Sequence, residues 1–407
     1  MITASLSPNT ESNDIFTAIR TLMMPWAWGN GTSGERVVHW FQSRYVVDTV
    51  SLFSSGRMAL MGILSSFDVG DGDEVLVQAF TCVAVPNSVL WVHAKPVYVD
   101  IDPSGNIDCT DAKKKVTSKT KAIIVQHTFG IAANMEAIVS FAKKYHLILI
   151  EDCAHSLGVS IKGKLLGTYG DAAFFSFGRD KVISSVWGGV AIIKNNKPKE
   201  SHALYAFEKS LSKSSLVWIA KQLLHPLVFA ISMPFYRIGI GKALIAFFKA
   251  IGMITLPIYP TEYTGGLPIE LSTQYPNALA SLICIQLSKL DRYKKMRDET
   301  SHVYITYVEN SKKVHTFDTP FGGTYLRFPL LVSDPAIVAR AAIKEGILLG
   351  NWYTRVIDPR GVSFDSVYYI QGSCPHAEEI AKHILNLPTR LTKSERDRVC
   401  SFLSRYV

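Results

Sequence analysis

Short apolar runs alternate with runs of helical spacing along the first half of the chain. Between Met135 and His146 the apolar residues recur at the spacing of one helix face, and the run ends in basic residues, which predicts an amphipathic helix. The predicted strands are residues 73–80, 95–101, 121–127 and 147–152. Strands that alternate with helices pair in parallel and are covered on both faces, so the pattern predicts an α/β fold with a mostly parallel sheet.

Polar residues gather where two of the predicted strands end. Gln126 and His127 close one strand, and Glu151 and Asp152 close the next. Ligands of parallel sheets bind outside the carboxyl ends of the strands. We therefore expect a ligand site at this edge of the sheet.

A smaller α+β unit is predicted to follow the sheet domain. A long amphipathic helix is expected from Leu279 to Lys295, and the strand-like run TYLRFPLLV comes after it, followed by three helical runs. The predicted regions are a large domain over 1–200, an apolar helical insertion over 201–262, a connecting helix region over 263–300 and a small C-terminal domain over 301–407.

Residues 203–259 are strongly apolar, and three interpretations stay open. Lys221 and Pro226 interrupt the first apolar run, while Lys242 and Lys249 interrupt the second and share one helical face. The helices cover the protein's own core or a subunit interface, or they lie in a membrane surface through one basic face, or they form a membrane hairpin. The interruptions make the hairpin the least favoured, because a span needs roughly 20 predominantly apolar residues.

The charge and the cysteine content narrow the range of partners, metals and cellular locations expected for the protein. The formal net charge is +9 over 407 residues. Such an excess can accompany nucleic acid, an acidic membrane surface or anionic small substrates, but an ordinary Lys-rich surface is the favoured explanation. There is no long basic block and no nucleic-acid motif, so no nucleic acid is expected. The six cysteines lack metal-ligand spacing, so no metal site is expected. The N-terminal residues lack the basic and apolar regions of a signal peptide, which predicts a cytoplasmic protein.

The segment from Glu151 to Gly189 carries the candidate chemistry. Lys181 follows the apolar strand AAFFSF on a tight loop, where partial desolvation lowers the pKa of a lysine and frees its amine for Schiff-base formation. Asp152 could face a pyridinium nitrogen, and His155 could donate to a phenolate oxygen. Glu151 points to the other side of an extended strand and is expected to be structural. The ordinary alternatives are a solvated lysine, a helix cap and a packed histidine.

A second segment supplies a candidate phosphate site. Ser55 and Gly56 open a helix in SLFSSGRMAL, and the free N–H groups of such a turn attract phosphate. Arg57 could add a charge-assisted contact, and Ser176 a second hydroxyl. Together with Lys181, these residues indicate pyridoxal 5'-phosphate as the cofactor.

Taken in order, these segments resemble the DegT/StrS family of pyridoxal-phosphate-dependent nucleotide-sugar aminotransferases. The motifs that carry the resemblance are SSGRMAL, GDEV with FTCVA, EDCAHSLG, SFGRDK with WGG, and QLSKLD, and it extends from about Gly29 to the end of the chain apart from the insertion. The resemblance implies the type I aminotransferase fold, with a small C-terminal domain. It also implies a homodimer whose active sites lie at the subunit interface.

By position, the resemblance makes Lys181 the Schiff-base lysine, Asp152 the partner of the pyridine nitrogen and His155 the neighbour of the ring oxygen. Gly56, Arg57 and Ser176 match the phosphate cradle.

Four positions depart from the family pattern. Cys82 stands where many members stack an aromatic residue on the cofactor ring. Ser272 and Gln274 stand roughly where many members carry an Asn-x-Arg element that the partner subunit supplies. Arg57 replaces a common threonine, and we hypothesise that its guanidinium takes over part of the phosphate contacts.

The resemblance implies a transaminase that moves an amino group from an amino acid, expected to be glutamate, to a keto-sugar nucleotide in surface-polysaccharide or secondary-metabolite biosynthesis. Trp352, Tyr353 and Arg355 are candidates for a substrate-facing loop, with hinge packing as the alternative. Two other functions stay open. One is a sugar dehydratase, which Lys181 argues against because such relatives carry histidine there. The other is a cofactor-binding regulatory protein without turnover, held at the inner membrane face through 203–259.

Overall fold

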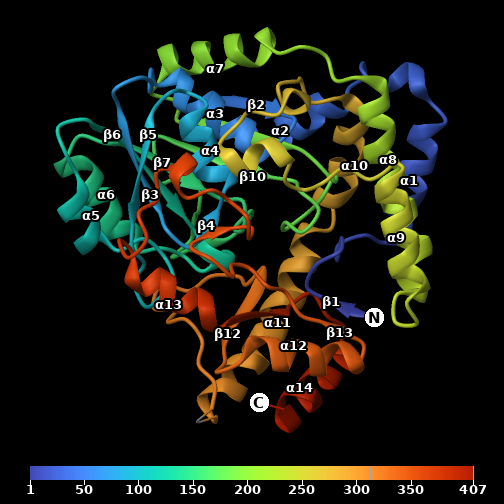
Figure 1. Ribbon diagram of the computed structural model, residues 1–407. Helices are drawn as coiled ribbons and strands as arrows, with labels where there is room; N and C mark the ends of the chain where they lie inside the picture. Colours follow the sequence, from blue (N-terminus) through green and yellow to red (C-terminus); the bar gives the residue numbers. More distant parts are fainter. Residues whose placement is uncertain (312, 407) are drawn as a thin grey trace.

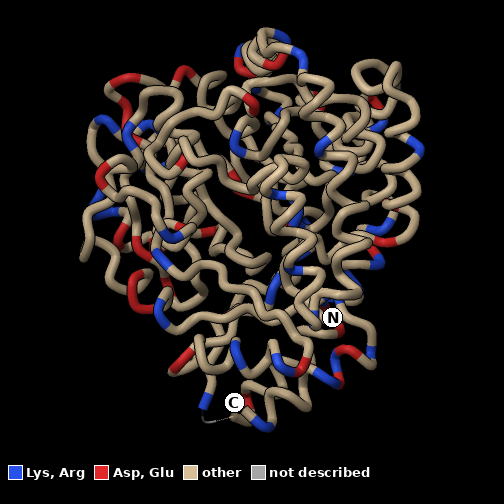
Figure 2. Tube along the Cα trace, turned by 45° about the vertical axis from the view of Figure 1, so that its right-hand side comes forward, with Lys and Arg blue, Asp and Glu red and all other residues tan. Residues whose placement is uncertain are grey.

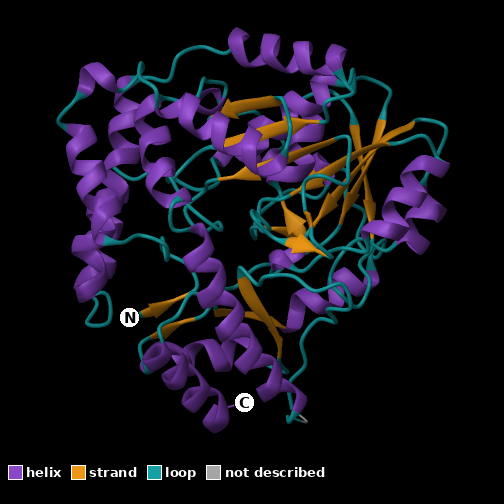
Figure 3. Cartoon of the chain, turned by 180° about the vertical axis from the view of Figure 1, so that it is seen from behind, coloured by secondary structure: helices purple, strands orange, loops and turns teal. Residues whose placement is uncertain are grey.

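Seven strands form the central sheet of the larger part of the molecule (Figure 1; Figure 3). The computed structural model describes residues 1–311 and 313–406. In spatial order the strands are β2 (Thr49–Phe53), β11 (Gly189–Ile193), β10 (Ala172–Ser176), β7 (Ile148–Asp152), β6 (Thr120–Gln126), β3 (Glu74–Gln78) and β5 (Lys95–Val99). Only β11 runs antiparallel to its neighbours within this sheet. The predicted α/β fold with a mostly parallel sheet is therefore confirmed.

Helices cover both faces of this sheet because its strands are apolar on both sides. Phe174 and Phe175 are consecutive in β10 and belong to different core layers. Phe174 shares its layer with α3 (Gly56–Ser66), whereas the ring of Phe175 lies 5.1 Å from that of Phe41 in α2 (Ser33–Tyr45). The remaining helices against the sheet include α4 (Ala84–Leu90), α5 (Cys109–Lys115) and α6 (Met135–Lys144).

The smaller unit is built on the antiparallel pair β12 (Arg327–Leu331) and β15 (Ile384–Pro388). Its helices are α12 (Pro335–Lys344), α13 (Pro375–His383) and α14 (Lys393–Tyr406). The chain's first strand, β1 (Ile2–Thr3), pairs with β13 (Ile347–Leu348) of this unit. The predicted boundary is thus corrected, since the N-terminal residues lie with the small unit although the sequence placed residues 1–200 in the large domain (Figure 1).

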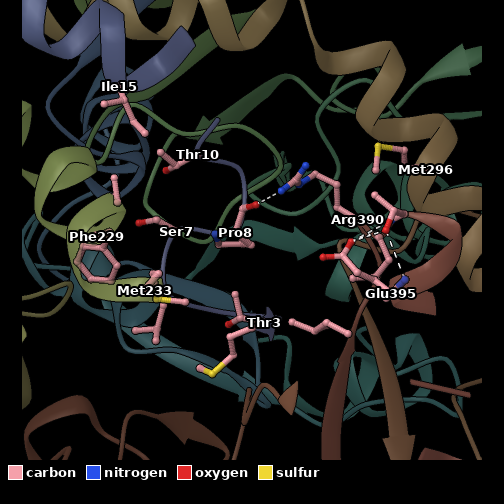
Figure 4. A pocket seen from close by; sticks show the side chains of 16 residues that line it. Thr3, Ser7, Pro8, Thr10, Ile15, Phe229, Met233, Met296, Arg390 and Glu395 are labelled. Atoms are coloured by element: carbon pink, nitrogen blue, oxygen red, sulfur yellow. Dashed lines mark hydrogen bonds between the residues drawn. The ribbon is translucent and has the colours of Figure 1, made fainter. Parts of the chain in front are cut away.

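The N-terminal segment that leads away from β1 borders a cavity of about 240 Å³ between α8 (Leu216–Ser232) and the small unit. Figure 4 shows Arg390 reaching across this space to the carbonyl of Pro8. Glu395, beside Arg390 in Figure 4, accepts from the backbone and the hydroxyl of Thr392 within the small unit. The hydrogen bond from Arg390 to Pro8 therefore ties the N-terminal segment to the small unit.

The long helix predicted over Leu279–Lys295 is two helices, α10 (Asn277–Leu287) and α11 (Leu290–Glu309). The break places the buried Lys289 against the buried Asp14, with 2.7 Å between the ammonium nitrogen and the carboxylate oxygen. α11 also runs past residue 300, so the predicted division at 300/301 cuts through a helix. A single continuous helix was wrong because a buried ion pair, invisible in the helical spacing, fixes the turn.

The insertion consists of α8 (Leu216–Ser232), a short 3-10 turn (Met233–Phe235) and α9 (Ile240–Ala250), after α7 (Pro198–Ser210). α8 lies along α1 (Ser12–Leu22), and α9 folds back on α8 (Figure 1). Among the described residues one helix, Leu216–Phe235, has the length and apolar character to cross a membrane, but half of it is buried in the protein. Part of α8 is therefore core, as the first interpretation of this segment expected.

We predict that Lys289→Met lowers the free energy of unfolding by about 3 kcal/mol, because it leaves the carboxylate of Asp14 buried without its partner. Urea denaturation measures this change. The matched control is Lys294→Met, which breaks the more exposed pair with Asp298 and should cost about 0.5 kcal/mol or less. Equal costs for the two variants would contradict the structural role of the buried pair.

Candidate active site

A cavity of about 660 Å³ opens at the carboxyl ends of the strands, between the sheet, the insertion and the small unit. The sequence-predicted residues converge on it with the exception of Arg355. Those that line it are Ser55, Gly56, Arg57, Cys82, Asp152, His155, Ser176, Lys181, Trp352 and Tyr353. The expected position of the site at this edge of the sheet therefore agrees with the structure.

Lys181 lies on the loop between β10 and β11, and its amine points at His155. The distance from Lys181 Nζ to His155 Nε2 is 2.9 Å, and Nζ is 4.7 Å from the centre of the Trp352 ring. The side-chain amide of Asn9 donates to the carbonyls of Lys181 and Val182 and so anchors the loop. Burial lowers the pKa of Lys181, which favours the uncharged amine that Schiff-base chemistry requires.

The ring of His155 has a defined tautomer. The backbone N–H of Phe129 donates to Nδ1 at 3.2 Å, so in the neutral ring the proton lies on Nε2. Burial, with the charges of Lys181 and Arg327, keeps the pKa of His155 well below its usual range. His155 therefore presents an N–H donor to Lys181, whose uncharged amine can accept that hydrogen bond.

Asp152 and Glu151 end β7 and face opposite sides of the sheet, as expected for neighbours in a strand. Asp152 lines the cavity, and burial raises the pKa of its carboxyl although the N–H of Ala154, at 3.0 Å, opposes the rise. Glu151 is buried on the other side and accepts from three backbone N–H groups at 2.6–2.7 Å, those of Gly167, Tyr169 and Gly170. Glu151 therefore holds a loop in place, as the sequence suggested.

His127, Glu151 and Cys153 offer ligand atoms within 4.8 Å of one another. The carboxylate of Glu151 already serves the three backbone donors and lies 3.3 Å from His127 Nε2. The other ring nitrogen of His127 accepts from the N–H of Ala133. Burial also raises the pKa of the Cys153 thiol well above its usual range, which disfavours a thiolate ligand. We interpret this cluster as a hydrogen-bonded support for β7.

The start of α3 forms a close-packed cradle with Ser176. Ser55 is the N-cap, and its hydroxyl accepts from the N–H of Met58 at 3.3 Å. A Cβ added at Gly56 would lie 2.8 Å from Ser176 Cβ, so the backbone approaches β10 only because this residue is glycine. Helix N–H groups without intrahelical partners and the hydroxyl of Ser176 are suited to a phosphate group.

Arg57 lines the same cavity but is already paired. Its guanidinium forms an ion pair with the buried Glu262, donates to the carbonyl of Pro257 at 2.9 Å and lies 5.1 Å from the centre of the Trp187 ring. The contribution of Arg57 to phosphate binding stays a prediction. The structure instead shows Arg57 joining α3 to the end of the insertion.

The aromatic residues near Lys181 come from the small unit. Trp352 stacks beside His155 with ring centres 5.4 Å apart, and Tyr353 lies 6.3 Å from the same ring. Arg355 is not brought to the cavity, because its guanidinium packs over the ring of Phe364 at 4.2 Å. We therefore withdraw Arg355 from the candidate substrate residues.

The other three departures from the family pattern are also visible. Cys82 lines the cavity, and burial raises the pKa of its thiol, so it packs there as an uncharged group. Ser272 and Gln274 do not line the cavity. Their backbone groups bond to Ser212, in the segment that follows α7.

Sequence reasoning missed Arg327, at the start of β12. This arginine is 1% exposed, and its three guanidinium nitrogens have no hydrogen-bond partner among the described residues. Its nearest charge is Asp180, 3.4 Å away, and it stacks on the Trp352 ring at 3.6 Å. Asp180 and Trp352 both line the cavity. An arginine at the head of an apolar strand was the available signal in TYLRFPLLV.

A family model for the DegT/DnrJ/EryC1/StrS aminotransferases matches residues 11–215 and 259–404. The chain belongs to this family. The family uses pyridoxal phosphate, as the sequence predicted, and the match omits only residues 216–258 between its two parts. The cradle, the buried amine of Lys181 with its lowered pKa, the N–H donor of His155 and the buried carboxyl of Asp152 fit this cofactor.

Curated relatives include the GDP-perosamine synthase of Escherichia coli O157:H7, 33% identical over 194 residues, which are 47% of this chain and 53% of that protein. The UDP-N-acetyl-3-dehydro-alpha-D-glucosamine 3-aminotransferase of Acidithiobacillus ferrooxidans is 38% identical over 34% of this chain and 38% of that protein. The L-glutamine:2-deoxy-scyllo-inosose aminotransferase of Streptomyces kanamyceticus is 39% identical over 34% of this chain and 33% of that protein. The chain spans about half or less of the length of these relatives.

Solved structures show the same fold over nearly the whole chain. The aminotransferase from Psychrobacter cryohalolentis has a TM-score of 0.74 and 19% identity, covering 98% of both chains. A Streptococcus pneumoniae protein described as a sugar aminotransferase in its PLP form has a TM-score of 0.75 and 18% identity, covering 98% of this chain and 97% of that one. These structures establish the type I aminotransferase fold.

We predict that Gly56→Ala weakens binding of pyridoxal phosphate by about one order of magnitude, since overpacking of this kind costs about 1–3 kcal/mol. Equilibrium dialysis measures the dissociation constant. Gly29→Ala is the matched control, because a Cβ there meets nothing within 4 Å and should leave cofactor binding unchanged. Unchanged affinity in Gly56→Ala would remove α3 from the phosphate site.

Proposed function

We propose that the protein is a pyridoxal-phosphate-dependent aminotransferase that transfers an amino group from an amino acid to a keto-sugar nucleotide. The observation that carries the proposal is the 2.9 Å contact between the amine of Lys181 and the N–H donor of His155 inside a buried cavity. When bound, the cofactor supplies an electron sink that stabilises negative charge at the α-carbon of the amino acid.

Lys181 has two tasks in this proposal. Its uncharged amine binds the cofactor covalently between turnovers, and once released it accepts and returns the α-proton of the substrate. Burial favours the form of the amine that can accept a proton. The anchored loop keeps this amine beside His155, so the proton carrier stays in place when the covalent bond is broken.

The other cavity residues would orient the cofactor and hold it in place. Asp152 would face the ring nitrogen and keep a proton there, and the N–H of His155 would donate to the ring oxygen. Ser55, Gly56 and Ser176 would hold the phosphate. Trp352 and Tyr353 would line the substrate side of the cavity and exclude water from it.

Arg327 supports an amino acid as donor. Its buried guanidinium forms no hydrogen bond among the described residues and has only the 3.4 Å ion-pair contact with Asp180, and a carboxylate is the ligand whose geometry it matches. We propose that the α-carboxylate of the donor, glutamate in our interpretation, binds Arg327 at the edge of Trp352. The acceptor is proposed from the names of the relatives, which include two nucleotide-sugar enzymes and an aminotransferase of a keto-inositol.

A homodimer, a cytoplasmic location and a role in surface-polysaccharide or secondary-metabolite biosynthesis belong to the same proposal. The alternative of a cofactor-binding protein without turnover rests on Cys82, which offers less stacking area than an aromatic ring. The absorbance of the holoprotein with and without glutamate distinguishes the aminotransferase from the protein without turnover.

The holoprotein is expected to absorb in the visible through its lysine-bound cofactor, and the band should shift on addition of glutamate with release of 2-oxoglutarate. Absorbance spectroscopy and a coupled assay of the oxo acid measure both. Lys181→Ala should abolish the release, because the proton carrier is lost. A band that glutamate and other amino donors leave unchanged would favour the protein without turnover.

Arg327→Met is expected to raise the KM for glutamate about 10- to 100-fold, the range expected for loss of hydrogen bonds to a charged group. The half-reaction with the keto-sugar should keep its rate, because that substrate has no α-carboxylate. Arg355→Met, outside the cavity, is the control. If both variants retain the normal KM, the donor carboxylate binds elsewhere.

A further inference from the structure

The outer surface of the insertion exposes large apolar side chains close together. They lie at the end of α8, in the turn that follows it and on α9, and each is between 47% and 69% exposed. We call this set the hairpin tip; its residues are Ile231, Phe235, Ile238, Ile240, Phe247 and Ile251. Single exposed apolar residues are ordinary, whereas a cluster of this kind marks an interaction surface.

The same segment carries positive charge only. Residues 209–261 contain six Lys and Arg and neither Asp nor Glu, although the whole chain has 34 acidic residues and a net charge of +9. Elsewhere both signs are scattered along the trace (Figure 2). Arg237 and Lys242 are exposed among the residues of the hairpin tip. An apolar face interleaved with basic residues is complementary to a bilayer with anionic headgroups.

We propose that the hairpin tip docks on the surface of an anionic lipid bilayer, with α9 lying in the interface and its apolar side chains between the headgroups. α9 has 11 residues, which give about 16 Å of helix against a hydrocarbon core of about 30 Å. α8 is held by α1, and Gln222 and His225 are buried within the protein. The hairpin therefore rests on the bilayer and does not cross it.

A second copy of the chain is a poorer occupant of this surface. A two-fold interface sets the patch against a copy of itself, so Arg237 and Lys242 would face a segment that contains no acidic residue to pair with. Like charges brought together in an interface oppose association. An anionic bilayer provides the opposite charge.

Docking would bring the active cavity to the bilayer. Phe229, Ile245, Lys249 and Ile254 of the same hairpin line the cavity. One face of the hairpin is thus a wall of the site, and the opposite face is free to meet lipid. The inference does not depend on the proposed aminotransferase activity, and the family model leaves this segment unmatched.

The test is flotation of the full-length holoprotein with phosphatidylcholine vesicles that contain or lack phosphatidylglycerol. Binding is expected only with the anionic lipid and should weaken as salt is raised. Arg237→Gln/Lys242→Gln should lower the partition coefficient about 25-fold, at about 1 kcal/mol for each basic residue. Phe235→Ser/Ile238→Ser/Phe247→Ser should abolish binding, because it removes the inserted side chains.

The matched control is Ile337→Ser/Ile370→Ser, which removes two exposed apolar residues of the small unit and should bind as the wild type does. Absorbance of the bound cofactor and thermal unfolding check that each variant folds. If the apolar variant does not fold, the charge variant still tests whether the hairpin tip binds the anionic bilayer. Absence of wild-type flotation overturns the proposal. If the wild type binds no vesicles and the apolar variant changes from dimer to monomer in sedimentation velocity, a second copy of the chain covers the hairpin tip instead.

Discussion

The tautomer of the histidine in the candidate site depends on one backbone hydrogen bond. The N–H of Phe129 occupies Nδ1 of His155, which leaves the proton on Nε2 and turns it toward Lys181. The donor is held in place by its loop: Phe129 has a φ of 55°, and a Cβ on the next residue, Gly130, would lie 2.0 Å from the carbonyl of Thr324. The loop after β6 and the entry to the small unit therefore define together which side of the histidine can donate.

At the end of β7 the pleat of the strand turns two neighbouring carboxylates to opposite faces of the sheet. Glu151 is taken up by backbone donors on one face, while Asp152 is left for the cavity on the other. Glu151 and Asp152 thus have the same side-chain chemistry but different roles, because the strand fixes their directions. Asp152 forms no salt bridge among the described residues, and the N–H of Ala154 donates to its buried carboxyl.

Much of this could be predicted from the sequence because it depends on local pattern. The strand ends, the Ser-Gly helix start and the lysine after AAFFSF each lie within a few residues of the signal that reveals them. The misses depend on contacts between distant segments. Lys289 breaks a helix because Asp14 lies beside it, and Arg57 is paired because Glu262 packs against it. Arg327 is significant because it contacts Asp180 at 3.4 Å but forms no hydrogen bond among the described residues. Apolar spacing contains no information on such pairs.

The short parallel pair β4 (Thr81–Cys82) and β14 (Ile357–Asp358) joins the small unit to the large one beside the cavity. The N–H groups of Thr81 and Val83 donate to the carbonyls of Val356 and Asp358, at 2.9 and 2.8 Å. Spreading the two units apart at this edge would rupture main-chain hydrogen bonds beside a wall of the cavity. This seam therefore fixes the two units at this edge, and the freedom needed to admit a large substrate has to come from other parts of the lining, which include the insertion and the N-terminal Leu6 and Ser7.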